Sequence, residues 1–168
     1  MGDFDIIGSM QLIPSFQIDH LRLKPGIYVS RVDEVGGDFV TTFDIRMKRP
    51  NAEPAVHVNA LHTIEHLAAT YLRSDPVWKD RIVYWGPMGC LTGNYLLMKG
   101  RPSPQEIAPL VTAAFKFVRD FEGEVPGAKP AECGNYLLHD LPMAKWEAAR
   151  YVETLENAPT YEYPTKAD

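Results

Sequence analysis

The segment Val58-Asn-Ala-Leu-His-Thr-Ile-Glu-His-Leu-Ala-Ala-Thr-Tyr-Leu-Arg73 organises the rest of this sequence. Its apolar residues recur at the three- and four-residue intervals of one helix face, and no glycine or proline follows before Pro76. That face consists of Leu61, Ile64, Leu67, Ala68 and Leu72. The pattern predicts a helix from Val58 to Arg73 with one side packed against a core.

Candidate strands lie on both sides of this helix in the sequence. Residues 27–35 and 39–47 are rich in β-branched and aromatic side chains, and Gly36-Gly37 between them is typical of a hairpin turn. Residues 81–85 and 92–98 surround a second turn, Gly86-Pro-Met-Gly89. The sequence therefore predicts antiparallel strands and places Cys90 at a bend.

Two more helices are predicted toward the C-terminus. Ser103-Pro-Gln-Glu106 has the form of a capping box and begins an amphipathic stretch that ends by Gly123, with a kink or a late start expected at Pro109. Asp140 is expected to cap a helix that ends near Asn157. These elements together predict an α+β fold, an antiparallel sheet with helices packed on one face.

Length and charge restrict the classes of protein that this chain can represent. Its 168 residues suit a single domain, residues 1–168, with residues 158–168 as a peripheral tail. The net charge of −5 argues against a nucleic-acid or anionic-membrane partner, and no apolar run approaches the roughly 20 residues that cross a bilayer. With two cysteines and no basic secretory segment at the N-terminus, we expect a cytoplasmic protein with reduced thiols.

His62-Thr-Ile-Glu-His66 carries the strongest chemical signal. Two histidines four residues apart lie on one face of a helix, close enough for their imidazoles to share a metal ion. The order His-x-x-Glu-His is that of inverse zincins, and Glu65 is placed to move protons at a metal-bound water or substrate. The alternative is a pair of ordinary helix histidines beside a solvated glutamate.

A two-histidine site needs a third protein ligand if it is to keep one position open for chemistry. The candidates are Cys133, His139, His57, His20 or a carboxylate, and Cys133 is preferred because a thiolate binds divalent first-row metals strongly. The other thiol, Cys90, lies between glycines that allow a substrate to approach. A nearby cation would favour its thiolate as a base or nucleophile, whereas the alternative for either cysteine is a buried, inert side chain.

These motifs, in this order, resemble the S-ribosylhomocysteine lyase (LuxS) family. The resemblance rests on Ser15-Phe-Gln-Ile-Asp-His20, Phe43-Asp-Ile-Arg46 with Pro50-Asn51, His62–His66, Pro87-Met-Gly-Cys90-x-Thr-Gly93, and Glu132-Cys-Gly-Asn-Tyr136 with His139-Asp-Leu141. It implies metal ligands, an acid/base pair and substrate contacts. The corresponding residues are His62, His66 and Cys133 for the metal, Glu65 and Cys90 for proton transfer, and Ser15, His20 and Arg46 for substrate, while Arg73 matches a further family arginine.

The resemblance also implies a reaction and an assembly. A ferrous ion, replaceable by zinc or cobalt, would help to move the carbonyl along the ribose of S-ribosylhomocysteine until β-elimination releases homocysteine. The second product would be 4,5-dihydroxy-2,3-pentanedione, the autoinducer-2 precursor of quorum sensing, and the reaction would also serve the methyl cycle. Family members are homodimers with active sites at the subunit interface, and the same is expected here.

The stretch before Pro87-Met-Gly-Cys90 departs from the family pattern. Where the family usually has Asp-x-Ser before Pro-Met-Gly-Cys, this chain has Tyr84-Trp85-Gly86, which alters the wall of the pocket. Two alternative functions follow. The His-x-x-Glu-His motif alone would also suit an inverse-zincin metallohydrolase, and Tyr84 with Gly86 would suit a non-catalytic, metal-containing binder of a sugar thioether.

Overall fold

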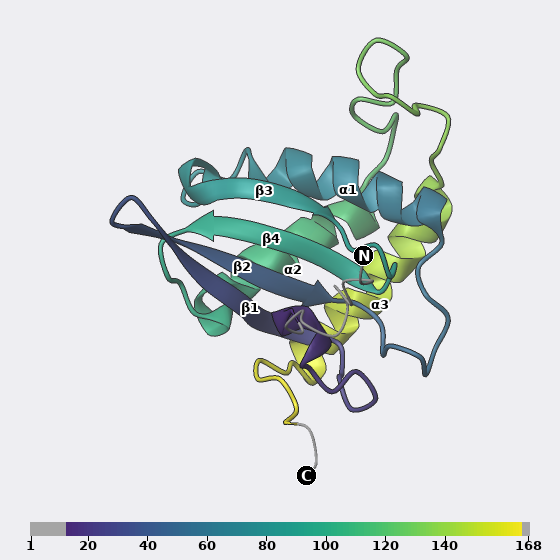
Figure 1. Cartoon of the computed structure of the whole chain (residues 1–168). Helices are drawn as coiled ribbons and strands as arrows, with labels where there is room; N and C mark the ends of the chain where they lie inside the picture. The colour runs from purple at the N-terminus through teal and green to yellow at the C-terminus, as the bar shows by residue number, and fades with distance from the viewer. Residues whose placement is uncertain (1–12, 166–168) are drawn as a thin grey trace, which may run out of the picture.

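A four-stranded antiparallel sheet forms the centre of the computed structural model, which describes residues 13–165. Figure 1 shows the strands side by side in the order β1-β2-β4-β3. Their bounds are Gly26–Val35 (β1), Asp38–Arg46 (β2), Ile82–Pro87 (β3) and Gly93–Lys99 (β4). Each neighbouring pair is antiparallel, so the two hairpins predicted from the sequence join through β2 and β4.

The turn between β1 and β2 follows directly from its glycines. Gly36 and Gly37 have φ angles of 59° and 87°, in the left-handed region that glycine occupies without steric cost. Two successive residues of this kind match the twist of a tight hairpin. The dipeptide therefore fixes the pairing of Val35 with Asp38 on either side of it.

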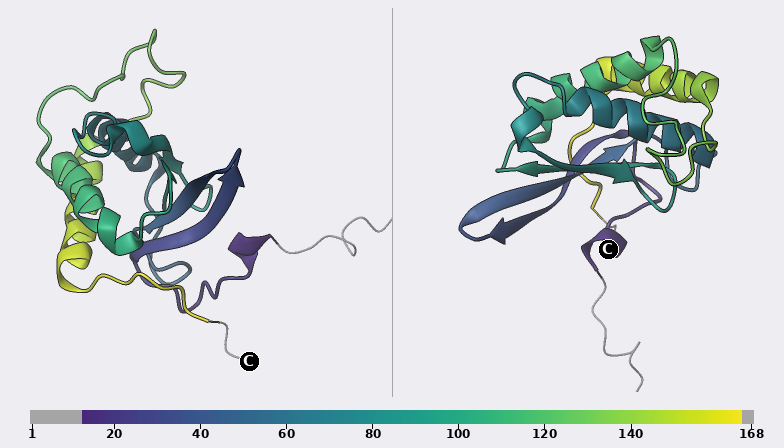
Figure 2. Two further views of the ribbon diagram at one scale, coloured as in Figure 1. Left: turned by 90° about the vertical axis from the view of Figure 1, so that its left-hand side faces the viewer. Right: turned by 90° about the horizontal axis from the view of Figure 1, so that it is seen from above.

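Three helices cover one face of this sheet, as the sequence predicts, and Figure 2 shows them together on that side. They are α1 (Val58–Leu72), α2 (Pro104–Asp120) and α3 (Leu141–Asn157), and short 3-10 turns occupy Pro14–Phe16 (η1) and Lys79–Arg81 (η2). The predicted caps are present. Ser103 and Glu106 exchange both bonds of a capping box, and Asp140 accepts from the amide of Met143. Pro109 lies inside α2 without delaying its start.

The two faces of the sheet differ because side chains alternate along each strand. Phe43, Ile45 and Leu96 face the helices and are fully buried in the main core. Between them along the strands, Asp44 and Tyr95 belong to the opposite side, here called the open face. In Figure 2, η1 and the C-terminal segment lie on this open face, across the sheet from the helices.

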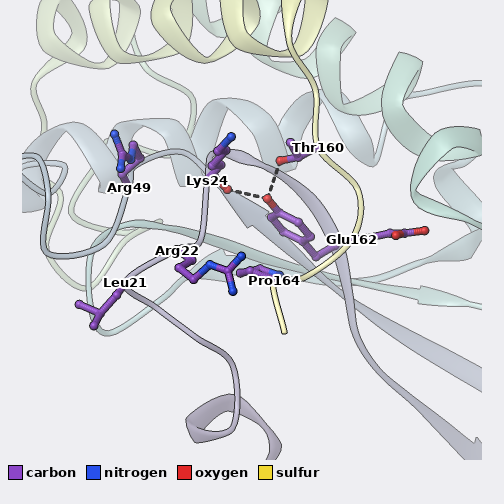
Figure 3. Close-up of a pocket in the computed structure, with 8 residues that line it drawn as sticks. Leu21, Arg22, Lys24, Arg49, Thr160, Glu162 and Pro164 are labelled. Atoms are coloured by element: carbon purple, nitrogen blue, oxygen red, sulfur yellow. Dashed lines mark hydrogen bonds between the residues drawn. The ribbon is translucent and has the colours of Figure 1, made fainter. Parts of the chain in front are cut away.

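The end of the chain is tied to the edge of the sheet. The amide of Ile27 donates to the carbonyl of Thr160 at 3.0 Å, and the Thr160 hydroxyl lies 2.5 Å from that of Tyr28 (Figure 3). Tyr28 also donates to the carbonyl of Lys24 at 2.7 Å, and Arg22 donates to that of Thr165 at 3.0 Å. Much of the segment predicted as a tail therefore has specific contacts with the sheet.

Some sequence expectations fall outside the described residues. The N-terminal segment, read as lacking a secretory signal, spans residues that the structure does not describe, and so do the last three positions of the predicted tail. Within residues 13–165, no helix combines the length and apolar character needed to span a bilayer.

Replacing Gly26 by alanine tests the junction between the sheet and the C-terminal segment. A Cβ at this position would collide with the backbone carbonyl of Thr160, so we expect Gly26→Ala to lower the free energy of unfolding by about 1–3 kcal/mol. Urea unfolding monitored by fluorescence measures this change. Gly89→Ala is the matched control because its Cβ would meet nothing within 4 Å, and equal midpoints for the two variants would contradict the prediction.

Candidate metal centre and thiol pocket

The flank of α1 carries the predicted pair of histidines. His62 and His66 are half-buried there, and the connection between α2 and α3 folds back against them. This connection supplies two backbone acceptors. His62 Nδ1 lies 2.6 Å from the carbonyl of Leu138, and His66 Nδ1 lies 2.7 Å from that of Pro126.

These two contacts fix the tautomer of both rings. A carbonyl oxygen only accepts, so each Nδ1 carries the proton and each neutral ring presents a lone pair at Nε2. The Nε2 atoms of His62 and His66 lie 3.0 Å apart. Two lone pairs this close repel each other unless a cation lies between them, so this donor pair fits a metal ion.

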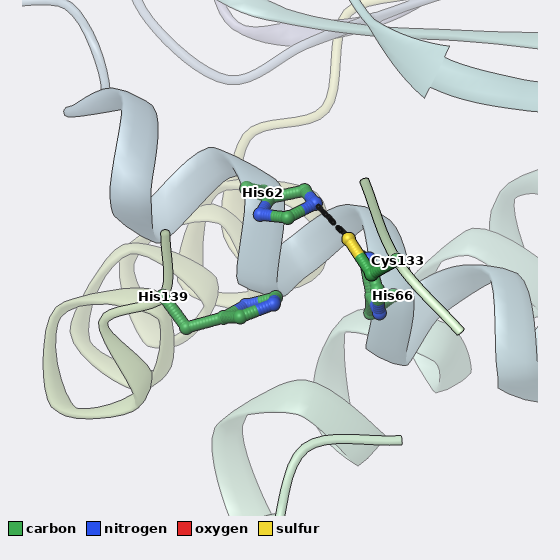
Figure 4. A group of neighbouring side chains, drawn as sticks. All are labelled: His62, His66, Cys133 and His139. Atoms are coloured by element: carbon green, nitrogen blue, oxygen red, sulfur yellow. Dashed lines mark hydrogen bonds between the residues drawn. The ribbon is translucent and has the colours of Figure 1, made fainter. Parts of the chain in front are cut away.

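Cys133 completes the cluster from the connection. Its Sγ lies 3.5 Å from Nε2 of His62 (Figure 4). The same sulfur accepts from the amide of Asn135 at 3.5 Å. In a tetrahedral site with ordinary metal–ligand bonds, neighbouring ligand atoms lie about 3.3–3.6 Å apart. The separation of Cys133 Sγ from His62 Nε2 matches this spacing, and the two Nε2 atoms, at 3.0 Å, are somewhat closer together.

His139 lies in the same cluster, with ligand atoms of all four residues within 4.8 Å of one another. Its ring stacks on His62 at 4.2 Å between centroids, and its Nδ1 lies 2.9 Å from Oγ1 of Thr63. Burial, followed by electrostatic interaction with His62 and His66, lowers the pKa of His139 to about 4. Its Nε2 is buried and has no hydrogen-bond partner among residues 13–165.

The cluster therefore narrows the alternatives that the sequence left for a third ligand. Cys133 and His139 both lie beside the histidine pair, whereas His57 caps the start of α1 and His20 lines a different cavity. Glu65 lies on α1 between the two histidines and is half-buried. The sequence offered His139 as one of several candidate ligands. It could not predict that His139 lies beside the histidine pair, because that position depends on how the connection between α2 and α3 folds.

A second group of predicted residues surrounds Cys90. Ser15, His20, Arg46 and Cys90 line one cavity of about 190 Å³, which also includes Tyr95 from β4. The positions come from segments far apart in the sequence, and the resemblance alone grouped them. Arg73 lies elsewhere, at the C-terminal cap of α1, where it donates to the carbonyl of Val83.

A buried ion pair orients the Arg46 guanidinium, which lines this cavity. Asp44 and Arg46 are almost fully buried and form two hydrogen bonds, of 2.6 and 3.0 Å. Arg46 Nη1 then donates to the Thr92 hydroxyl at 2.7 Å and lies 3.8 Å from Sγ of Cys90. The guanidinium is thus held between a carboxylate and a thiol.

The same contacts favour the thiolate of Cys90. Burial alone would raise the pKa of this thiol, but hydrogen bonds with the side chain and backbone of Thr92 and the charge of Arg46 lower it below its ordinary value. Because only the thiolate is a strong base or nucleophile, this environment suits a reactive cysteine. It does not suit the inert cysteine considered as the alternative.

The two residues that depart from the family pattern are coupled in space. The Tyr84 side chain is 49% exposed and folds back over Gly86, where a Cβ would collide with its hydroxyl. A tyrosine in this rotamer therefore requires glycine two residues later. Tyr84 also lines a second hollow on the open face, next to Tyr95 and Leu97.

A larger hollow of about 420 Å³ lies beside the C-terminal segment (Figure 3). Arg22, Lys24 and Arg49 line it together with Glu162. It contains none of the residues predicted for metal, proton transfer or substrate. The predicted metal ligands lie in the metal cluster and Cys90 lies in its own cavity, and these two sites have no residue in common.

Fold and site together define a small α+β protein with a histidine–cysteine metal centre and an activated thiol. The family model described as S-ribosylhomocysteinase (LuxS) matches residues 13–162, and the chain belongs to this family.

Relatives from several bacteria agree with this assignment. An S-ribosylhomocysteine lyase of Phocaeicola vulgatus is 69% identical over 160 residues, covering 94% of this chain and 99% of the relative. One from Porphyromonas gingivalis is 63% identical, covering 91% of this chain and 96% of its own length. One from Clostridium beijerinckii is 51% identical, covering 87% and 92% respectively.

Removing one imidazole tests the metal centre. We expect His66→Ala to weaken Co²⁺ binding by more than about 100-fold. Loss of a residue that only hydrogen-bonds to a metal ligand already weakens metal binding by about 10–100-fold, and loss of a ligand itself should cost more. Titration against a competing chelator, followed by the thiolate-to-cobalt absorption band, measures the affinity. His57→Asn is the matched control, since asparagine retains a cap for α1 outside the cluster. Equal affinities for both variants would exclude His66 as a ligand.

Proposed function

We propose that this protein cleaves the thioether of S-ribosylhomocysteine to give homocysteine and 4,5-dihydroxy-2,3-pentanedione. The observation that carries the proposal is the donor cluster of His62, His66 and Cys133, in a chain 69% identical to a relative named S-ribosylhomocysteine lyase. The lowered pKa of Cys90 supports it further, because this chemistry needs a thiolate near neutral pH.

The reaction makes specific demands on the protein. The carbon–sulfur bond breaks only after a carbonyl lies next to an acidic C–H, so the sugar must first be isomerised by repeated proton transfers. His62, His66 and Cys133 would hold a divalent cation, which would supply Lewis acidity to the substrate. Cys90 and Glu65 take up and return the protons.

The cavity residues hold the substrate during these transfers. Arg46 helps to lower the pKa of Cys90 and donates toward a sugar oxygen, while Ser15 and His20 contact the ribosyl group from the same cavity. Elimination then breaks the C–S bond, the electron pair leaves on sulfur, and a proton forms the free thiol of homocysteine. The product carbonyls remain on the five-carbon fragment.

Ferrous iron is the metal that we propose for this site. Two imidazoles and one thiolate also suit zinc and cobalt, so ligand type does not distinguish these ions. Both cysteines are free in the described structure, in keeping with a reducing cytoplasm. There the second product would enter autoinducer-2 formation for quorum sensing, and homocysteine would return to the methyl cycle.

We further propose a homodimer with two active sites at the subunit interface. The metal cluster belongs to the helix layer, whereas the Cys90 cavity lies against the open face, and the two have no residue in common. The open face also exposes Tyr84 beside Leu97 in an apolar hollow. A second copy docked on this face would cover the hollow, and we propose that it also places its metal cluster next to the Cys90 of the first chain.

The metallohydrolase alternative explains less of the structure. A peptidase would use the metal and Glu65 but would not require a thiol whose pKa is lowered by Arg46. The non-catalytic binder, suggested by Tyr84 with Gly86, is likewise less favoured in a chain 69% identical to a relative named S-ribosylhomocysteine lyase.

Thiol release separates these functions. Anaerobically purified, iron-loaded protein incubated with S-ribosylhomocysteine is expected to release free homocysteine, measured with a thiol reagent. Cys90→Ala and Glu65→Gln should each reduce turnover by about 10²–10⁴-fold, the usual contribution of a positioned acid or base. Full activity of Cys90→Ala would favour a hydrolase, and tight binding without thiol release would favour a binder.

Subunit complementation tests the shared active site. A heterodimer of Cys90→Ala with Glu65→Gln, purified through two different tags, is expected to regain about half of wild-type activity, because one of its two sites is then intact. The matched control is a heterodimer of Cys90→Ala with Arg46→Lys. Both changes affect the thiol cavity, so each of its two sites contains one altered residue and neither site is intact. Equally inactive heterodimers would place all catalytic residues of a site in one chain.

A further inference from the structure

We infer that residues 160–165, here called the C-terminal strap, form part of the thiol site, and that Tyr163 is a positioning residue acting on Cys90 through Asp44 and Arg46. The inference rests on the proposed function only in giving Cys90 a reacting role. It assigns a specific task to a segment that the sequence presents as a peripheral tail.

The strap places the Tyr163 ring against the open face of the sheet. Its ring stacks on that of Tyr28 at 4.7 Å between centroids, with only 12° between the ring planes. Its hydroxyl donates to Oδ2 of Asp44 at 2.8 Å. Tyr163 also lines the cavity that contains Cys90, so the strap forms one wall of that cavity.

A continuous series of contacts leads from this hydroxyl to the thiol. Oδ2 of Asp44 accepts from Tyr163 and from Nη2 of Arg46, the latter at 2.6 Å. Nη1 of the same guanidinium lies 3.8 Å from Sγ of Cys90. A tyrosine that fixes the rotamer of the carboxylate therefore also fixes the direction of the guanidinium.

The buried setting makes this hydroxyl important. A buried ion pair is stable only when the remaining lone pairs of its carboxylate are satisfied, and Tyr163 satisfies one of them. By accepting this bond, Asp44 neutralises less of the Arg46 charge, which leaves more of it to stabilise the thiolate. Burial and the charge of Asp44 raise the pKa of Tyr163, so its hydroxyl stays protonated and able to donate.

The role of Tyr163 does not follow from the family assignment. The match to the family model ends at residue 162, one position before this tyrosine. The segment was predicted as a tail because no periodicity or motif ties it to the rest of the sequence. Its contacts with Tyr28 and Asp44 depend on the path of the chain after α3.

Other groups around the thiol set the pH dependence of its reactivity. Asp44 and Arg46 face the cavity from β2, Tyr95 from β4, His20 from the segment before β1, and Tyr163 from the strap. Any change in thiolate formation caused by Tyr163 must therefore be measured against variants that leave these other groups in place.

Tyr163→Phe removes the hydroxyl and keeps the stacked ring. Alkylation of Cys90 by iodoacetamide, followed from pH 6 to pH 10 by peptide mass spectrometry in the metal-loaded protein, reports its thiolate separately from Cys133. We expect the rate at pH 7 to fall about threefold and the inflection to move to higher pH. Tyr161→Phe, the same change two residues earlier in the strap, should leave the rate unchanged.

A second variant makes the test independent of one substitution. A chain ending after Glu162 keeps the Thr160 contacts with Ile27 but lacks Tyr163, and it should show at least the loss seen with Tyr163→Phe. Thr92→Val serves as a positive control because Thr92 contacts Cys90 directly. Thermal unfolding of each variant reports whether the fold is retained.

The outcomes separate positioning from simple packing. Slower alkylation in both Tyr163 variants, with folded protein, supports the inference. A lower unfolding temperature with unchanged Cys90 alkylation would show a purely structural contact and would overturn it. Because alkylation needs no substrate, this result stands apart from the lyase assay, whose failure would instead remove the proposed function.

Discussion

The arrangement of the site depends on two imidazoles whose Nε2 atoms are held 3.0 Å apart. The spacing of His62 and His66 on α1 brings the rings together, but backbone carbonyls at positions 126 and 138 turn both lone pairs toward one point. Those carbonyls belong to the connection between α2 and α3, which is largely irregular. A cation at that point would therefore tie this connection to α1 as well as complete the site.

Much of the fold was predictable because its signals are local. The apolar period of α1, the glycine pair of the first hairpin and the caps at Ser103 and Asp140 each act within a few residues, and the structure confirms all of them. The histidine pair was predictable for the same reason, since four residues make one helical turn.

The rest of the site depends on contacts between distant segments, which no local pattern encodes. His139 joins the metal cluster only because the connection folds back on α1, where Thr63 holds its ring. The contact between Tyr163 and Asp44 spans more than a hundred positions in the sequence. The resemblance grouped Cys90 with Arg46, but the buried Asp44 that orients this arginine became evident only in the structure.

Tyr84 and Gly86, where the sequence departs from the family pattern, also belong to the open face of the sheet. Gly86 leaves the space that the Tyr84 ring occupies, so the pair acts as one substitution that exchanges a polar wall for an aromatic one. Tyr84 keeps about half of its surface exposed next to Leu97, and such a surface is stabilised when another apolar surface covers it. In a dimer joined through this face, Tyr84 would contribute to both the interface and the pocket wall. A change there would then alter affinity for the second subunit and for the substrate together.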